Sequence, residues 1–357
     1  MTTWESWPTT HYKLTDVQQS SRPTDPSVSR VSILDVAAAA GVSKSAVSRA
    51  LLGQSGASSE VSNHVREVAA QLGYVKDVRA QSLKSTSNRT VAVFVRSMRL
   101  SFYGELITAI QETLEQAGYS LAIAAGSGSN TPHEGNLYTL MGSRPAGVII
   151  ASGRLPASDI RTVAAGDAPV VLAGPLSKSR KIGSVADDIS GAVEMALRVA
   201  ASGHRRVGIV TVPSARSSTL GSRSERMRRE LQELGIEPVT IALDAKSDVP
   251  RVASLRQAIE QVTVIMCPSD PILVSTWEVL QSWGLNVPED ISLTGYDGIG
   301  QLASPVFGIT TWRQPIEDIG RAAARQVLAR ITDPNTPATH EFLSGKYIPG
   351  RTLTSLS

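Results

Sequence analysis

Two cationic residues and three serines within one short stretch offer the chemistry of nucleic-acid recognition. Lys44 and Arg49 stand among Ser43, Ser45 and Ser48. Lys and Arg donate hydrogen bonds to guanine O6 and N7, whereas a serine hydroxyl pairs with any base or with a phosphate. Each serine taken alone fits an ordinary helix cap or surface residue equally well. The stretch therefore predicts a base-reading surface only if a helix turns its cationic residues outward.

The surrounding pattern predicts three short helices that would present this stretch. Ser32, with Asp35 three residues later, is typical of a capping box, and apolar residues then recur at helical spacing up to Gly41. A second helix is expected over residues 44–52 and a third over 59–72. Two helices joined by a tight glycine turn form the helix-turn-helix pattern, whose second helix enters the major groove N-terminus first. The earliest outward residues of 44–52 would then reach the base edges.

The net positive charge of the chain is concentrated around these helices. The chain has 35 Lys and Arg against 32 Asp and Glu, a net charge of +3. Residues 31–89 hold seven cationic and four acidic side chains, so this segment accounts for the whole excess. A module that faces a polyanion is expected to carry such a local excess. An ordinary solvated surface of this length would also accommodate it.

The composition predicts a globular chain of roughly two to three domains. The 357 residues are 41% hydrophobic, and no apolar run approaches the roughly 18 residues of a membrane-spanning helix. Cys267 is the single cysteine, which excludes an intrachain disulfide and a cysteine-rich zinc site. Residues 1–30 lack an apolar period and a recognisable secretion signal. We expect a disordered tail there, and a cytoplasmic protein.

From residue 90 onward, buried strands alternate with amphipathic helices. Apolar runs such as Val148-Ile-Ile-Ala151 are typical of a parallel sheet covered on both faces. Repeated strand–helix units predict two doubly wound parallel sheets, with a ligand cleft between them at the carboxyl ends of the strands. The expected strands are 90–95, 120–125, 147–151, 169–173, 206–212, 238–242, 262–266 and 291–295. The expected helices are 103–117, 134–142, 188–202, 223–234, 250–260 and 271–283.

Motifs in a fixed order extend from the first helices to residue 315. The head contains Ile33-Leu-Asp-Val-Ala-Ala-Ala-Ala-Gly-Val-Ser43, followed by Ala46-Val-Ser-Arg49. Later motifs are Leu72-Gly-Tyr74, Ala80-Gln-Ser-Leu83, Gly203-His-Arg-Arg-Val207, Val287-Pro-Glu-Asp-Ile291, Gly295-Tyr-Asp297 and Thr310-Thr-Trp-Arg-Gln-Pro315. In order and spacing they resemble the lac-repressor/galactose-repressor (LacI/GalR) family of transcriptional regulators over about residues 31–350.

The resemblance implies an α/β chain in which an all-α helix-turn-helix head precedes a periplasmic-binding-protein-like body of two doubly wound parallel sheets. The implied parts are a disordered tail (1–30), a helix-turn-helix DNA-binding domain (31–76), a hinge helix with linker (77–89), and an effector-binding and dimerisation body (90–357). Within the body, the resemblance implies an N-subdomain of about 90–185 plus 316–332 and a C-subdomain of about 186–312 plus 340–357.

The resemblance also assigns DNA contacts to residues of the head. Lys44, Ser45 and Arg49 match base-contacting positions. Ser43, Ser48 and Ser58 match positions where phosphate contacts are expected. The implied partner is a near-palindromic double-stranded DNA operator, bound by a homodimer.

A leucine in the hinge is the second DNA contact that the resemblance implies. Leu83 matches a residue that wedges into the minor groove at the operator centre and bends the DNA. A lone leucine in a polar segment also fits a minor packing contact. Asp77 departs from the usual asparagine at the start of the hinge, and we interpret it as a helix cap.

The body is expected to bind a small-molecule effector, a sugar or a sugar derivative, between its sheets. The resemblance assigns this contact to Phe102, Arg226, Ser269, Asp270 and Asp297. Carboxylates and an arginine suit the vicinal hydroxyl groups of a sugar. No cofactor and no metal site are expected.

Several cleft positions depart from the family pattern. Gly174 stands where several members have an aspartate, and Arg96, Arg99 and Arg229 add guanidinium groups. A pocket that loses an acceptor and gains cations favours an anionic effector, such as a sugar phosphate or carboxylate. These arginines would equally suit a solvated surface.

Two other classes of protein share some of these features. An enzyme is not expected, because the five histidines are scattered and neither a G-x-S-x-G elbow nor a Walker A loop occurs. A periplasmic-type sugar-binding protein would share the body, but the segment 31–89 and the lack of an export signal argue against it. The sequence therefore predicts a sequence-specific, effector-controlled transcriptional regulator, most simply a repressor.

Overall fold

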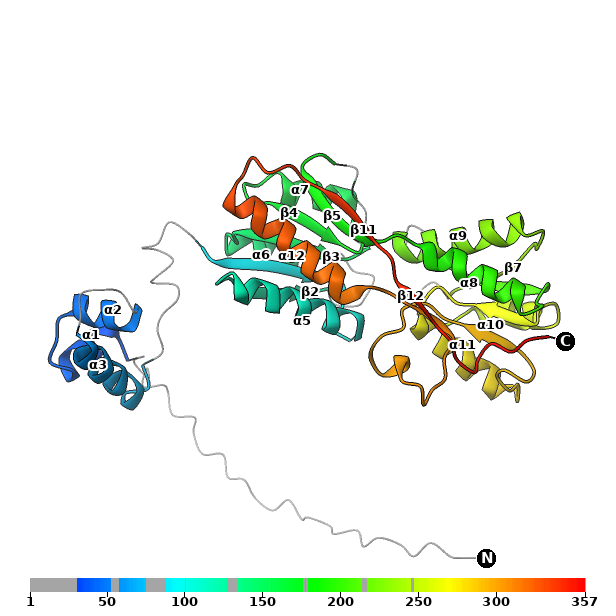
Figure 1. Cartoon of the computed structure of the whole chain (residues 1–357), viewed down its shortest axis with the longest axis horizontal. Coiled ribbons are helices and arrows are strands. Elements are labelled where there is room, and N and C mark those ends of the chain that lie inside the picture. The colour runs from blue at the N-terminus through cyan, green and yellow to red at the C-terminus, as the bar shows by residue number, and fades with distance from the viewer. Residues whose placement is uncertain are drawn as a thin grey trace, which may run out of the picture. The chain divides into compact units, whose positions relative to one another are not determined.

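The computed structural model divides the chain into two compact units, a head within residues 1–84 and a body within residues 85–357 (Figure 1). The described residues are 31–52, 58–74, 88–99, 101–126, 134–153, 155–175, 177, 179–213, 217–244 and 247–356.

The head consists of three short helices, α1 (Ile33–Ala39), α2 (Lys44–Leu52) and α3 (Ser59–Gln71). A complete capping box begins α1. The Ser32 hydroxyl accepts from the Asp35 N–H, and the Asp35 carboxylate accepts from the Ser32 N–H at 2.7 Å. Because helix caps depend only on neighbouring residues, the sequence predicts the limits of these helices closely.

A small apolar core holds the three helices together. Val36, Val47 and Val65, one from each helix, are fully buried. Gly41 takes a φ of +66°, so the turn between α1 and α2 uses the left-handed backbone that glycine adopts without strain. Leu72 is 38% exposed, because α3 ends at Gln71 and Leu72 is its C-cap.

The first half of the body is a parallel six-stranded sheet with strand order β11-β5-β4-β3-β1-β2 (Figure 1). Its strands are β1 (Thr90–Val95), β2 (Ser120–Ala125), β3 (Gly147–Ala151), β4 (Val170–Ala173), β5 (Ile182–Asp187) and β11 (His340–Leu343). Its helices are α5 (Ser101–Gln116), α6 (Glu134–Gly142), α7 (Ala157–Ala164) and α12 (Ile316–Thr332).

Both faces of this sheet are covered. Alternate residues of β1 point to opposite faces: Val91, Val93 and Val95 join α5 and α12 in one core, while Ala92 and Phe94 join α6 and α7 in another. Every residue of β3 is buried, as a central parallel strand requires.

The second half of the body repeats this plan on a smaller sheet, with parallel strand order β7-β6-β8-β9. Its strands are β6 (Val207–Thr211), β7 (Val239–Ala242), β8 (Val264–Met266) and β9 (Ser292–Thr294). Its helices are α8 (Ser190–Ala201), α9 (Ser218–Glu233), α10 (Val252–Ile259) and α11 (Asp270–Ser282). A short 3-10 helix, η1 (Gly300–Ala303), and an antiparallel pair, β10 (Thr311–Arg313) with β12 (Lys346–Ile348), complete it.

The path of the chain corrects one expected boundary. We expected residues 340–357 in the C-subdomain, but β11 pairs in parallel with β5, so residues 340–343 belong to the first sheet. β11 satisfies the backbone hydrogen-bonding groups along the outer edge of β5 before the chain crosses to β12. The helices α7 and α12 and the strands β5, β10, β11 and β12 were not predicted. None of the described helices is long and apolar enough to cross a membrane.

Candidate functional site

The outer face of α2 presents the cationic residues that the sequence singles out. Lys44, Ser45 and Arg49 are exposed, whereas Val47 and Ala50 are buried against α1 and α3. Arg49 Nε donates to the Ser45 carbonyl at 3.3 Å. Among the described residues, the two terminal guanidinium nitrogens of Arg49 have no hydrogen-bond or ion-pair partner. This face can therefore donate hydrogen bonds to an external acceptor.

Two of the predicted phosphate-contacting serines cap helices. Ser43 Oγ accepts from the Ala46 N–H at 3.2 Å, and Ser58 Oγ accepts from the Val61 N–H at 3.3 Å. A hydroxyl that accepts in this way keeps its own O–H to donate. Both serines are exposed, whereas Ser48 is half-buried. Leu83 lies outside the described residues.

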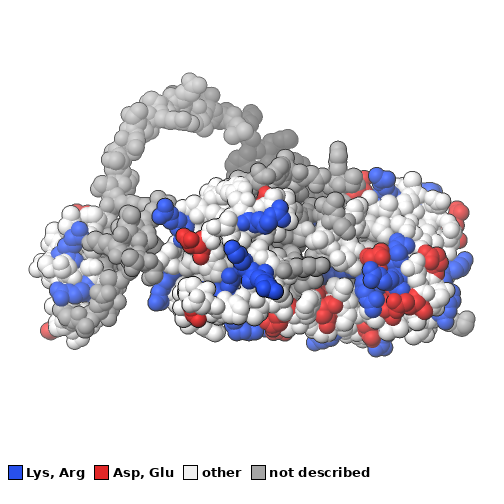
Figure 2. Space-filling model, turned by 90° about the horizontal axis from the view of Figure 1, so that it is seen from above, with Lys and Arg blue, Asp and Glu red and all other residues white. Residues whose placement is uncertain are grey.

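Charge is distributed differently on the body. On the face seen in Figure 2, blue and red side chains lie close together over much of the body. Helical ion pairs are one reason: Arg198 lies 2.7 Å from Glu194, and Arg228 lies 3.8 Å from Glu225. By contrast, α2 carries two cationic residues and no acidic one.

A cavity of about 580 Å³ lies between the two sheets of the body. Its walls come from the segments that follow the carboxyl ends of strands in both sheets, the usual ligand position in open α/β sheets. The charged residues in its lining are Arg96, Arg99, Asp187, Asp188, Arg223, Asp248, Asp270 and Asp297.

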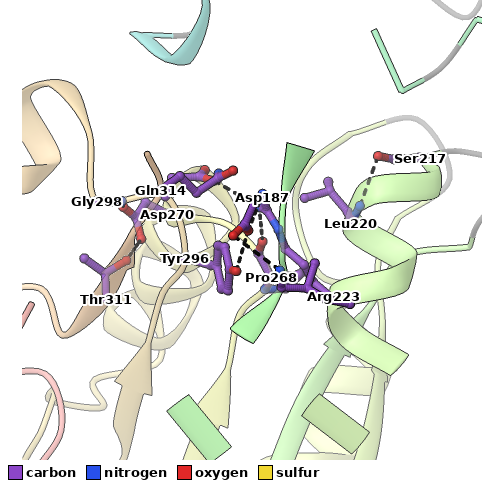
Figure 3. A network of polar contacts seen from close by, with 12 residues as sticks. Asp187, Ser217, Leu220, Arg223, Pro268, Asp270, Tyr296, Gly298, Thr311 and Gln314 are labelled. Carbon is purple, nitrogen blue, oxygen red and sulfur yellow. Dashed lines mark hydrogen bonds and ion pairs between the residues drawn. The ribbon is translucent and has the colours of Figure 1, made fainter. Parts of the chain in front are cut away.

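A buried arginine from α9 organises the floor of this cavity (Figure 3). Arg223 Nη1 donates to Asp297 Oδ1 at 3.1 Å and to the Pro268 carbonyl at 3.2 Å. Arg223 Nη2 lies 3.8 Å from Asp187 Oδ2. The guanidinium also lies over the Tyr296 ring, 4.1 Å from its centre. Arg223 is 2% exposed, so a full charge is held away from water by two carboxylates and an aromatic face.

This network joins the two halves of the body. Asp187 ends β5 in the first sheet, whereas Tyr296 follows β9 in the second, and the Tyr296 hydroxyl donates to Asp187 Oδ2 at 2.5 Å. Burial raises the pKa of Asp187, while the charge of Arg223 and the hydrogen bond from Tyr296 oppose the shift. A ligand that displaced these contacts would alter how the two sheets are held together.

The two aspartates predicted for effector binding are also engaged. Asp270 accepts from the Thr311 hydroxyl and from the Gly298 N–H, each at 2.7 Å, and burial raises its pKa. Asp297 accepts from Gln314 Nε2 at 2.5 Å. Burial raises the pKa of Asp297 to about 7, against the lowering effect of the nearby guanidinium. The floor is therefore polar, buried and largely hydrogen-bonded within the protein.

The structure brings four of the five predicted effector residues to the cavity. Phe102, Ser269, Asp270 and Asp297 line it. Arg226 does not: its Nη2 donates to Glu230 Oε2 at 3.0 Å, one helical turn further along α9. The arginine that reaches the cavity from this helix is Arg223, three residues earlier.

The sequence contained a signal that distinguishes these two arginines. Arg223 stands four residues before Met227, which is fully buried, so both lie on the inward face of α9. Arg226 stands four residues before Glu230 and forms an ordinary helical ion pair with it. Asp187 and Tyr296 could not be identified from the sequence in this way. Their roles depend on burial and on a hydrogen bond between the two halves of the body, and both are features of the tertiary structure. Among the described residues, no group of three His, Cys, Asp or Glu side chains is arranged to hold a metal ion.

Comparison with protein families matches both units of the chain. The profile of a family described as bacterial regulatory proteins, lacI family, matches residues 32–77. A profile described as a periplasmic binding protein-like domain matches residues 196–353. The ribose operon repressor of Haemophilus influenzae is 27% identical over 308 residues, which cover 84% of this chain and 92% of that protein. The catabolite control protein A of Priestia megaterium is 28% identical over 303 residues, covering 83% and 91%.

Solved structures show the same fold. The lac repressor dimer bound to operator and the anti-inducer ONPF matches with a TM-score of 0.75 and 21% identity, over 91% of this chain and 99% of that one. A lacI-family regulator from Silicibacter pomeroyi matches with a TM-score of 0.73 and 25% identity, also over 91% and 99%. These matches confirm the predicted helix-turn-helix head and parallel α/β body.

Proposed function

We propose that this chain is a lacI-family repressor that binds a DNA operator under the control of a small-molecule effector. The observation that carries the proposal is the exposed cationic face of α2 on a packed three-helix head. The same chain carries a body with a cavity of ligand size.

We assign base reading to the exposed first turns of α2. Lys44, Ser45 and Arg49 would enter the major groove, where Lys and Arg select guanine. Ser43, Ser48 and Ser58 would donate to phosphates and so set the register of the head without adding sequence information. The exposure of five of these six side chains supports the assignment, and Ser48 is half-buried.

We further propose that two copies of the chain act together. One recognition helix per chain reads one half-site, so a two-fold dimer would require a near-palindromic operator. Leu83 would wedge into the minor groove at the centre of that operator. The similarity to the lac repressor dimer bound to operator supports the proposed dimer and its operator.

The effector we propose is a sugar or a sugar derivative bound between the sheets. Supporting observations are the cavity itself and its floor of carboxylates beside one arginine, which suits vicinal hydroxyl groups. Binding there would shift the population of body conformations and, through the hinge, the fraction of dimers able to dock on DNA. We also propose that this regulator acts on DNA in the cytoplasm and has no catalytic role, in line with the regulators it resembles.

Selection of bound sequences from a random DNA pool tests the proposal. We expect enrichment of one near-palindromic sequence whose half-sites lie about one helical turn apart. Affinity for it should fall by about 10³–10⁵ between 50 and 200 mM salt if 6–10 phosphates are neutralised. Recovery of no preferred sequence, with binding insensitive to salt, would overturn the proposal.

A further inference from the structure

We propose that the effector is an acidic sugar, whose carboxylate or phosphate lies against Arg99 and Arg96 while its hydroxyl groups face the floor of the cleft. This inference rests on the proposed function, because it names the chemical class of the effector for the same cavity. It depends on how the charges in the lining are paired.

The lining has five carboxylates against three guanidinium groups, but four of the carboxylates already have partners within the protein. Asp187 and Asp297 share the guanidinium of Arg223, and Asp270 holds two hydrogen bonds from the protein. Asp188 accepts from the Ser190 N–H at 2.9 Å. Their remaining lone pairs suit hydroxyl donors, so this floor favours the polyol part of a ligand over its anionic part.

By contrast, the segment that follows β1 favours the anionic part of a ligand. Arg96 and Arg99 both line the cavity. The guanidinium of Arg99 has no ion-pair or hydrogen-bond partner among the described residues. Arg96 pairs with Asp248 across the cavity, but at 3.6 Å the contact is longer than a hydrogen bond, and the Asp248 side chain is 34% exposed. An incoming carboxylate or phosphate could bind both arginines more closely than Asp248 does.

Other residues of the lining are small or neutral. Gly174 lines the same cavity with a φ of +99°, and a Cβ built there would meet no atom within 4 Å. Ser217, Ser218 and Thr219, from the first turn of α9, add neutral hydroxyls to the lining. The segment after β1 thus brings two guanidinium groups to the cavity, whereas the floor has paired carboxylates.

Calorimetric titration of the full chain with matched sugars tests the inference. The pairs are D-glucuronate with D-glucose and D-ribose 5-phosphate with D-ribose. We expect at least one acidic member to bind about tenfold or more tightly than its neutral partner, as one charge-assisted contact provides. The two pairs separate a carboxylate from a phosphate as the favoured anion.

Three variants locate the contact. Arg99→Gln should weaken binding of the acidic sugar about tenfold. Asp248→Asn should strengthen it, because the variant removes the carboxylate that competes for Arg96. Arg229→Gln is the matched control, since that arginine is 63% exposed on α9, outside the lining, and should change nothing.

The inference is overturned if a neutral sugar binds as tightly as its acidic partner, or if Arg99→Gln behaves like Arg229→Gln. Failure of both acidic sugars to bind at about 10 mM also overturns it. Operator binding is measured on the same preparation. If the chain binds operator DNA and only neutral sugars, the proposed function stands and this inference fails. If it binds acidic sugars but no operator DNA, this inference stands and the proposed function fails.

Discussion

The outer face of α2 and the floor of the cleft both carry charged side chains, but they differ in what those side chains already contact. Lys44 and Arg49 are exposed, and α2 holds no acidic residue. Arg223 and Asp297 are buried and are paired with each other. The charges on α2 are available to an external partner, whereas the charges in the floor are already paired within the protein and hold its two sheets together.

This difference predicts opposite responses to mutation. On α2, loss of a cation should weaken DNA binding and leave folding intact, because exposed side chains contribute little to stability. In the floor, loss of a charge leaves its partner buried and unpaired, so the stability of the body should suffer first. The four predictions below test this contrast.

Removal of the buried arginine should have the largest effect. We expect Arg223→Ala to lower the free energy of unfolding of the body by about 3–5 kcal/mol, because Asp187 and Asp297 lose their common cation. Urea denaturation followed by tryptophan fluorescence measures the loss. Arg226→Ala is the control and should cost less than about 1 kcal/mol, since that ion pair is only partly buried. Equal losses would contradict the central role of Arg223.

The raised pKa of Asp297 should make the stability of the body depend on pH. Its pKa is about 7 in the folded chain against 3.8 ordinarily, so the folded state retains a proton that the unfolded chain releases. The stabilisation is complete below about pH 4 and is lost as pH rises through about 7. We expect wild type to lose about 2 kcal/mol more than Asp297→Asn from about pH 5.5 to 7.5, because both chains keep Asp187 and Asp270, whose pKa values burial also raises.

The comparison between wild type and variant is needed because His204 acts in the opposite direction. Burial lowers the pKa of His204, so its unfavourable effect on stability fades as pH rises. Both chains retain this histidine, so its effect cancels in the difference between their pH profiles. Parallel profiles for the two chains would show that Asp297 is ionised in the folded body throughout.

The same contrast explains how much the sequence could predict. The limits of α1, α2 and α3 follow from caps and glycines that act within a few residues, and the sequence placed α2 correctly at 44–52. Strand β5 was missed because Gly183 and Ser184 interrupt its apolar pattern. Both are buried because β5 lies between β4 and β11, and α12 packs against Gly183 through Gln326.

The cleft shows the same limit at the level of single residues. Phe102, Ser269, Asp270 and Asp297 were predicted and line the cavity, but Arg226 was chosen where Arg223 stands. The choice between two arginines three residues apart depends on which side of α9 meets the second sheet. That packing is tertiary, whereas the exposure of Lys44 and Arg49 follows from helical period alone.

Truncation of the exposed arginine tests the other side of the contrast. We expect Arg49→Ala to cost about 1–3 kcal/mol of operator affinity and to relax the preference at one base pair, with an unchanged free energy of unfolding. Fluorescence anisotropy with the selected operator and its single-base variants measures both effects. A uniform loss over all sequences would assign Arg49 to a phosphate, and a loss of stability would contradict its exposed placement.

Removal of either of two helix caps within the head should give the smallest effects. The comparison should separate helix capping from phosphate contact. Ser32 and Ser43 each accept a backbone N–H three residues ahead, so Ser32→Ala and Ser43→Ala should each cost the head about 1 kcal/mol. Hydrogen exchange of the helix amides measures this loss. Only Ser43 stands at the start of α2, where its free O–H would donate to a phosphate. Operator affinity should therefore fall further in Ser43→Ala than in Ser32→Ala. Equal affinities would mean that Ser43 acts only as a cap, and that α2 meets the DNA through its cationic side chains alone.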